Sequence, residues 1–254
     1  MAESVCPICE GTGWKIVERA GLSGAERCEC AAAARARTLR DQSRIPPNYG
    51  HASLDNFHVP QDNPIARHGL GTVLMQVRAF VREFPAGDKP GLLLAGDTGT
   101  GKTHLAVAAL RGLLEKGYQG LFYDYQNLLD RIRASFDSAA GAGDREAYRA
   151  AMDAEVLLLD DLGSHRVTEW VEDTVTSIIT YRCNQRKPLI ATTNLGDPEI
   201  SGLVMDYKDP AGVAVYKKGL AEVIGARARS RLFEMCRVVR MPAVEDYRLR
   251  RDRA

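Results

Sequence analysis

The stretch that decides the fold is residues 91–103, GLLLAGDTGTGKT. Its apolar start, GLLLA (91–95), is typical of a short buried strand, and residues 103–117 read as a helix that ends at Gly117. Between them lies the pattern G-x-x-x-x-G-K-[ST], in which a glycine-rich turn folds its backbone N–H groups around a phosphate. Because this turn joins a strand to a helix, as the pattern requires, we expect a nucleotide site here.

Each residue type in this phosphate loop has a chemical reason. The glycines let the backbone approach a phosphate closely, and the helix N-terminus adds a partial positive charge. The ammonium group of Lys102 is expected to reach the β- and γ-phosphates, and the hydroxyl of Thr103 to bind Mg²⁺. The residues expected to hold the nucleotide are Gly96, Asp97, Thr98, Gly99, Thr100, Gly101, Lys102 and Thr103.

Polar side chains also follow two further apolar runs. The run VLLLDD (156–161) is typical of a buried strand that ends in two carboxylates. Asp160 is expected to hold Mg²⁺, and Asp161 to orient or deprotonate the attacking water, which adds hydrolysis to binding. Asn194 ends the strand 188–194 and is expected to position water beside the γ-phosphate, although in isolation it could equally be a turn residue.

Strand-like and helix-like runs alternate along residues 91–194. Further strands are expected at 120–125 and helices at 127–136 and 168–186, the last capped by Thr168 or a neighbour. This alternation predicts an α/β fold, a parallel sheet flanked by helices on both faces. Ligands of such sheets bind at the carboxyl ends of the strands, where the three motifs above are expected to meet.

The N-terminal segment contains four cysteines as a CxxC and a CxC pair. Two such pairs can complete a tetrahedral four-thiolate site, which favours zinc. So short a segment buries too little apolar area to fold by itself, and a bound metal would supply the missing folding free energy. The alternative is a redox dithiol, but no thioredoxin-like βαβ pattern surrounds it. Cys183 and Cys236 are expected to be buried without a ligand role. The expected zinc ligands are Cys6, Cys9, Cys28 and Cys30.

Composition and charge limit the class of protein. The chain has 254 residues, 45% of them hydrophobic, and a formal net charge of +1, so nucleic-acid binding cannot be argued from overall charge. It contains no apolar run of about 18 residues, and the N-terminus lacks the pattern of a secretory signal, so we expect a cytoplasmic protein. We divide the chain into a zinc-binding module with a helix (1–45, the helix at 31–44), a linker (46–56) and an ATPase domain (57–254).

Together these motifs resemble those of AAA+ ATPases, and within them the DnaC/DnaI/IstB group of helicase loaders and transposition ATPases. The resemblance covers about residues 45–254 and rests on RIPPNYGHASLDNF, GDTGTGKTHLA, VLLLDDLG, ATTN and GARARSRLFEM. It implies a P-loop AAA+ fold that binds ATP and Mg²⁺ and hydrolyses ATP slowly, stimulated by assembly or DNA. The segment 201–219 looks like an insertion relative to this group, and no function is assigned to it.

The resemblance also assigns roles to three arginines. Arg231 matches the arginine finger, which acts on ATP bound to a neighbouring subunit, and Arg227 matches a second arginine of that box. Arg248 matches the sensor 2 arginine, a contact to the phosphates of its own subunit. A planar, permanently charged guanidinium stabilises the charge that spreads over a transferring phosphoryl group. The alternative for each arginine is a surface ion pair.

The loaders of this group grip single-stranded DNA with residues that have counterparts here. Phe136, Thr168 and Trp170 match those DNA contacts, and Arg131 and Arg133 are candidates for phosphate contacts. Aromatic rings stack on bases of any sequence. The alternative is that Phe136 and Trp170 are core residues, which is the commoner role of aromatics at helical spacing.

The cysteine module helps to choose among functions, since some helicase loaders carry a zinc site in the domain that binds the helicase, whereas IstB-type transposition helpers usually lack one. The resemblance therefore favours an ATP-dependent loader of a DnaB-type replicative helicase onto single-stranded DNA, in replication initiation or restart, which self-assembles head to tail, as a hexamer or helix. One alternative is a transposition helper that selects target DNA. A second is a zinc adaptor that uses nucleotide only as a switch.

Overall fold

The computed structural model describes residues 6–19, 21–137, 145–201, 207–208, 214–215 and 218–248. Its centre is a five-stranded parallel sheet with the strand order β4-β5-β6-β3-β9, which confirms the expected parallel sheet. The fifth strand, β9, was not identified in the sequence. The strands are β3 (Gly91–Ala95), β4 (Gly120–Asp124), β5 (Val156–Asp160), β6 (Leu189–Thr193) and β9 (Cys236–Arg240).

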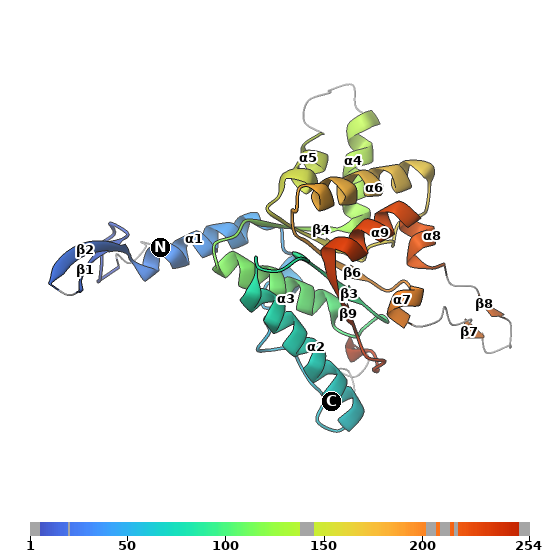
Figure 1. The fold of residues 1–254 in the computed structure, drawn as a ribbon, viewed down its shortest axis with the longest axis horizontal. Helices are drawn as coiled ribbons and strands as arrows, with labels where there is room; N and C mark the ends of the chain where they lie inside the picture. Colours follow the sequence, from blue (N-terminus) through green and yellow to red (C-terminus); the bar gives the residue numbers. More distant parts are fainter. Residues whose placement is uncertain are drawn as a thin grey trace.

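Helices cover both faces of this sheet (Figure 1). Alternate side chains of each strand point to opposite faces, so Leu92 and Leu94 pack with one group of helices and Leu93 and Ala95 with the other. The first face is covered by α2 (Pro64–Glu83) and α3 (Lys102–Glu115). The second is covered by α4 (Tyr125–Asp137), α5 (Arg145–Asp153), α6 (Glu169–Asn184), α8 (Leu220–Ile224) and α9 (Ala226–Met235).

The cysteine module stands at the end of an arm (Figure 1). It contains an antiparallel hairpin of β1 (Trp14–Arg19) and β2 (Leu22–Arg27), which was not expected from the sequence. The arm is α1 (Glu29–Gln42), close to the helix expected at 31–44. Its last turns pack on the ATPase body, because Leu39 is buried in the same cluster as α3 and Arg35 Nη2 donates to the carbonyl of Gly117 (3.3 Å).

The segment 46–56, expected to be a linker, is held along α3. It contains the short 3₁₀ helix η1 (Pro47–Tyr49) and the fully buried Ala52. The carbonyl of Ala52 accepts a hydrogen bond from Arg111 (2.6 Å), and that of Ser53 lies 3.0 Å from His104 Nε2. A proline-rich composition predicts an irregular segment, but it does not predict whether the carbonyls of that segment accept hydrogen bonds from the body. The division at residues 46 and 57 stays a prediction.

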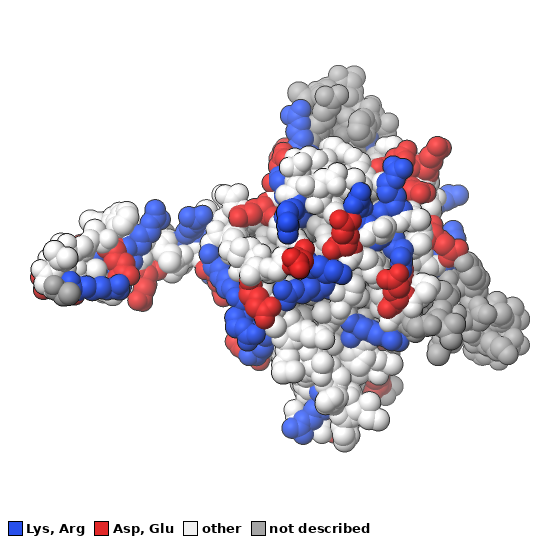
Figure 2. Space-filling view, viewed as in Figure 1, with Lys and Arg blue, Asp and Glu red and all other residues white. Residues whose placement is uncertain are grey.

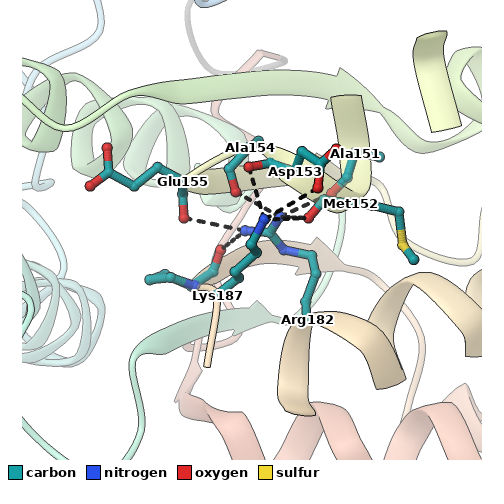
Figure 3. A network of polar contacts seen from close by, with 8 residues as sticks. Ala151, Met152, Asp153, Ala154, Glu155, Arg182 and Lys187 are labelled. Atoms are coloured by element: carbon teal, nitrogen blue, oxygen red, sulfur yellow. Dashed lines mark hydrogen bonds and ion pairs between the residues drawn. The ribbon is translucent and has the colours of Figure 1, made fainter. Parts of the chain in front are cut away.

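A buried arginine joins α5, α6 and the start of β5 (Figure 3). Arg182 is fully buried and donates to the carbonyls of Ala151 and Ala154, both at 2.9 Å, while Lys187 Nζ donates to those of Met152 (3.2 Å) and Asp153 (3.1 Å). Burial lowers the pKa of Arg182 to about 10, so it stays charged. The two cations satisfy carbonyls at the C-terminal end of α5, where a helix leaves them without internal partners.

The remaining elements are short. The chain forms α7 (Pro198–Ser201) and an antiparallel pair of β7 (Tyr207–Lys208) and β8 (Ala214–Val215) within the expected insertion. The rest of the segment 202–217 lies outside the described residues, as does AAGAGD (139–144), whose composition predicts a short flexible loop. Within the ranges described above, no helix combines the length and apolarity that crossing a bilayer needs.

Candidate functional site

The phosphate loop connects β3 to α3 through glycines in conformations that other residues rarely adopt. Gly99 and Gly101 have φ angles of +75° and +91°. A Cβ at Gly101 would lie 2.7 Å from the ring of Phe57, and one at Gly99 would lie 2.0 Å from the carboxyl carbon of Asp246. The loop is therefore enclosed by a residue before the sheet and by one after β9, and neither neighbour was identified from the sequence.

Lys102 begins α3 and is almost fully buried. Its ammonium group donates to the carbonyl of Asp97 (2.7 Å), whose oxygen also accepts from the hydroxyl of Thr100 (2.8 Å). Burial lowers the pKa of Lys102, while the carboxylates of Asp161 and Asp160 oppose that shift. The ammonium thus contacts the loop, and the Asp160 and Asp161 carboxylates at the end of β5 act on its charge.

The Asp160 carboxylate and the backbone of Asp161 are held by a threonine of the neighbouring strand β6. Thr192 donates to Asp160 Oδ1 (2.7 Å), and its hydroxyl oxygen accepts from the backbone N–H of Asp161 (2.9 Å). Burial raises the pKa of Asp160, and hydrogen bonds from Thr192 and Thr103 counter the shift. Asp161 has a φ of +58° and an exposed side chain, so the left-handed turn directs the second carboxylate away from the strand.

Thr192 is a contact of the candidate site that the sequence analysis did not identify. It stands two residues before Asn194 in the quoted stretch ATTN, but the adjacency of β5 and β6 that brings it to Asp160 comes from the structure. Asn194 follows β6 with an exposed side chain, at the same sheet edge as Asp160 and Asp161. The structure therefore brings together the phosphate loop, the two aspartates and Asn194.

The candidate arginines differ in their surroundings. Arg248 is anchored by Asp246, whose Oδ1 accepts from its backbone N–H (2.9 Å) and from its Nε (3.2 Å), and its charge acts on Lys102. Arg231 lies on α9 with its side chain 41% exposed and its guanidinium paired with Glu234 (2.6 Å). Arg227 is exposed on the same helix. Arg248 thus lies at the phosphate loop of its own chain, whereas Arg231 is partly exposed on α9, beside Glu234 and Cys183.

Two aromatic rings also lie near the loop. The rings of His58 and Tyr247 are 5.8 Å apart, and the backbone N–H of Tyr247 donates to the carbonyl of Gly99 (3.1 Å). His58 comes from the segment before α2 and Tyr247 from the segment after β9. No local sequence signal pairs them, because about 190 residues separate them and only the fold brings them together.

The candidate DNA contacts are partly committed to other roles. The hydroxyl of Thr168 caps α6 by accepting from the N–H of Val171 (3.3 Å), as expected. Trp170 is half-buried against the core, and the Arg133 guanidinium carbon lies 4.7 Å from its ring centroid. Phe136 lies in α4, but its side chain is outside the described part of the structure, and Arg131 is exposed. Acidic and basic side chains intermingle on the face in Figure 2, so charge does not single out a DNA surface there.

The four N-terminal cysteines form one cluster. All four sulfurs lie within 4.8 Å of one another, with 3.9 Å between Cys6 and Cys28 and 3.2 Å between Cys9 and Cys30. The N–H of Gly13 donates to the sulfur of Cys9 (3.4 Å). The interaction with Cys30 lowers the pKa of the Cys9 thiol to about 6. These separations fit four thiolates around one ion, so the cluster can hold a metal.

The family of IstB-like ATP binding proteins matches residues 72–208, more than half of the chain. The chain belongs to this family. Its P-loop and parallel sheet are therefore those of an AAA+ ATP-binding domain, as the resemblance implied.

Individual relatives of this IstB-like ATP-binding chain include helicase loaders. It is 24% identical to the replicative helicase loader DnaC of Escherichia coli strain K12 over 191 residues, 75% of this chain and 74% of that protein. The crystal structure of the DnaC helicase loader superposes with a TM-score of 0.62 at 32% identity and covers 78% of this chain and 100% of that one. The uncharacterized protein YqaM of Bacillus subtilis strain 168 is 25% identical to this chain. The match includes 84% of this chain and 65% of the length of YqaM.

Proposed function

We propose that this protein is an ATP-dependent loader of a DnaB-type replicative helicase onto single-stranded DNA. The observation that carries the proposal is the likeness to the DnaC helicase loader, whose solved chain is matched over its full length at 32% identity. The relation to the E. coli loader over three quarters of both chains supports it. ATP binding follows from the family, and the remaining steps are argued from the site below.

The phosphate loop and the β5 carboxylates supply the groups that ATP hydrolysis needs. Lys102 would exchange the carbonyl of Asp97, which its ammonium contacts at 2.7 Å, for phosphate oxygens. Thr103 and Asp160, whose side chains are hydrogen-bonded to each other, would hold Mg²⁺, which when bound neutralises phosphate charge. Asp161 and Asn194, both exposed at this edge, would orient the attacking water.

The arginines make hydrolysis depend on assembly. Arg248 would contact phosphates in its own subunit, with Asp246 fixing its orientation. Arg231 would leave Glu234 and reach ATP bound to the next subunit, because it is half-exposed and α9 lies at the surface of the body. A head-to-tail assembly supplies one such arginine to each nucleotide, so we expect slow hydrolysis that assembly or DNA stimulates.

The cysteine cluster would hold zinc and serve as the docking module. Four thiolates favour zinc over harder metals, and the metal when bound would supply folding energy that the small module lacks. On one face of the hairpin Trp14 and Ile16 are 51% and 82% exposed. Apolar side chains exposed side by side mark a protein-binding surface, and we assign this face to the helicase.

The grip on DNA would involve the end of α4 and the start of α6. Arg133 stacks on Trp170, and together they present a ring and a positive charge to a base and its phosphate. We propose that Phe136, Thr168 and Trp170 contact single-stranded DNA there.

Co-elution with the replicative helicase on a sizing column, with ATP present, tests the function. We expect a complex with the wild-type chain and at least about tenfold weaker binding for Ile16→Ser. Leu22→Ser is the matched control, because Leu22 is 77% exposed but lies on the opposite hairpin face. Equal loss with both variants would contradict the assigned face.

The alternatives predict different outcomes of the same experiment. A transposition helper would not bind the helicase but would bind duplex DNA and a transposase. A zinc adaptor would bind nucleotide and release no phosphate even with DNA present. Absence of any complex with the helicase would overturn the loader function.

A further inference from the structure

A continuous chain of contacts leads from the β5 carboxylates into the loop after β6. Thr193 donates from its hydroxyl to the carbonyl of Leu162 (2.9 Å), directly behind Asp160 and Asp161. The side chain of Leu195 fills the space beside Gly163, where a Cβ would lie 2.4 Å from Leu195 Cδ1. The two loops at the catalytic edge of the sheet are therefore packed on each other, and a shift of one displaces the other.

The same loop ends in a buried ion pair with α9. The side chain of Asp197 is 1% exposed, and both of its oxygens accept from Arg229, Oδ2 from Nε and Oδ1 from Nη2, each at 2.7 Å. Arg229 also pairs with Glu199 (3.1 Å) and lies over the ring of Phe233 (4.5 Å). A planar guanidinium held at two atoms has little freedom to turn, so the pair fixes α9 to the loop of Asn194.

Arg229 and Arg231 point to different sides of α9. Successive residues of an α-helix turn by about 100°, so residues two apart point nearly oppositely. The structure agrees, because Arg229 is 21% exposed against its own loop while Arg231 is 41% exposed toward solvent. The helix α9 thus carries Arg229, which is bound to the loop of its own nucleotide site, and Arg231, which points to the other side of the helix.

We propose that Asp197 and Arg229 are positioning residues that couple the nucleotide site of each subunit to the presentation of Arg231 to the next subunit. The proposal rests on the proposed ATPase function and the role of Arg231 in it. A nucleotide-dependent shift at Asn194 would move Asp197, three residues on, and Asp197 would carry α9 with it through Arg229. Because a buried pair breaks at high cost, the loop and helix move together rather than separately.

A mixed assembly of two variants tests this coupling. The first subunit carries Arg231→Ala and keeps an intact nucleotide site, while the second carries Asp161→Asn and keeps bound ATP and Arg231. Neither hydrolyses ATP alone, but a mixture restores hydrolysis where Arg231 of the second faces ATP of the first. Arg229→Met is then added to one subunit type at a time.

We expect Arg229→Met to lower hydrolysis by the mixture about tenfold or more when it is in the second subunit, which supplies Arg231. In the first subunit, which has no Arg231, its effect should be several-fold smaller. Arg229→Lys in the second subunit should recover part of the loss, because lysine keeps the positive charge but cannot bind both oxygens of Asp197 as the planar guanidinium does. Arg229→Met leaves Asp197 buried without this partner and should lower the melting temperature in either placement, so the difference between the two placements separates positioning from folding.

Equal losses in both placements would overturn the coupling, since a structural or local role has no such asymmetry. Hydrolysis that is unaffected in both would overturn it as well. Failure of the two parent variants to restore hydrolysis would contradict the proposed function itself, with or without Arg229→Met, and would remove the role assigned to the pair.

Discussion

At the scale of single residues, Thr192 shows how a side chain to which the sequence motifs assigned no role organises the candidate site. Its hydroxyl donates to Asp160 and accepts from the backbone of Asp161 at the same time. An isolated buried carboxylate is costly, and a hydrogen-bond donor is the usual remedy. The positions of Asp160 and Asp161 therefore depend on Thr192 of β6, a contact that the sequence pattern of β5 does not predict.

Thr192→Val removes this hydroxyl without changing the size of the side chain. We expect kcat for ATP hydrolysis to fall about tenfold to a hundredfold, because the carboxylates lose their orientation. ATP affinity should change little. Steady-state kinetics and equilibrium binding check this, with Thr192→Ser as the control that keeps the hydroxyl. A kcat equally low for both variants would contradict the role of the hydroxyl.

The buried carboxylate of Asp160 is expected to lower the stability of the fold while serving the proposed Mg²⁺ site. Burial raises its pKa in the folded state, so the folded protein is less stable above that pKa than it would be with a neutral group. Asp160→Asn should therefore raise the melting temperature at pH 7.5 and abolish Mg²⁺-dependent turnover. The gain should shrink as the pH falls toward the ordinary Asp pKa of about 4, where wild-type Asp160 is also neutral. Calorimetry across pH 4–8 tests this, and a gain independent of pH would exclude the titration.

Trp170 serves both the core and the proposed DNA surface. Trp170→Leu keeps an apolar group against the core but removes the ring, so with Phe136→Ala we expect single-stranded DNA affinity to fall by about 2–4 kcal/mol at two stacking contacts. Fluorescence anisotropy measures the affinity, and a melting curve verifies the fold. Unchanged affinity would mean that both aromatics are core residues only.

At the scale of elements, cationic side chains join helices to strands. Lys187 and Arg182 donate hydrogen bonds to backbone carbonyls at the end of α5 (Figure 3). Arg229 holds α9 to the loop after β6 through its ion pair with Asp197. These contacts determine how the covering helices sit on the sheet, which the apolar pattern of each helix leaves open. The arrangement of α9 in particular determines where Arg231 points.

Arg182→Met should destabilise the fold strongly. The change removes the donor to the carbonyls of Ala151 and Ala154 from a fully buried position, so we expect a loss of about 3 kcal/mol or more in the free energy of unfolding. Lys187→Met, at a half-exposed position, should cost about 1 kcal/mol or less. Urea denaturation measures both, and similar small losses would contradict the network.

At the scale of the whole molecule, the cysteine module is joined by a helix to a body that folds around its own sheet. The hairpin of the module is largely exposed, whereas the body buries a continuous apolar core on both faces of the sheet. Two parts so different in burial should differ in what stabilises them. The cysteine cluster would stabilise the first and the apolar core the second.

A strong chelator is therefore expected to unfold the module alone. Hydrogen exchange in residues 14–27 should rise to the rate of an unfolded chain, because structural zinc supplies on the order of 10 kcal/mol to modules of this kind. ATP affinity and exchange in β3–β6 should not change. Metal analysis of the purified protein should give one zinc per chain. Unaltered exchange in the hairpin after chelation would contradict a structural metal.

The sequence alone determined the features that depend on local chemistry. The strands of the sheet core, the phosphate loop and the Thr168 cap follow from residue types at fixed spacings, because a buried strand, a phosphate cradle and a helix start each restrict neighbouring residues. The two cysteine pairs likewise announced their cluster, which the structure confirms as four sulfurs close enough for one ion. These elements matched to within two residues in most cases.

Only the tertiary structure decided which distant residues meet. The hydroxyl of Thr192 on Asp160, Asp246 against Gly99 and the pair of Asp197 with Arg229 join segments about 30 to 150 residues apart. The edge strand β9 and the packing of 46–56 along α3 belong to the same class, since neither has a periodic pattern of its own. Contacts of this kind depend on the order of strands and the path of the chain, which local propensity does not encode.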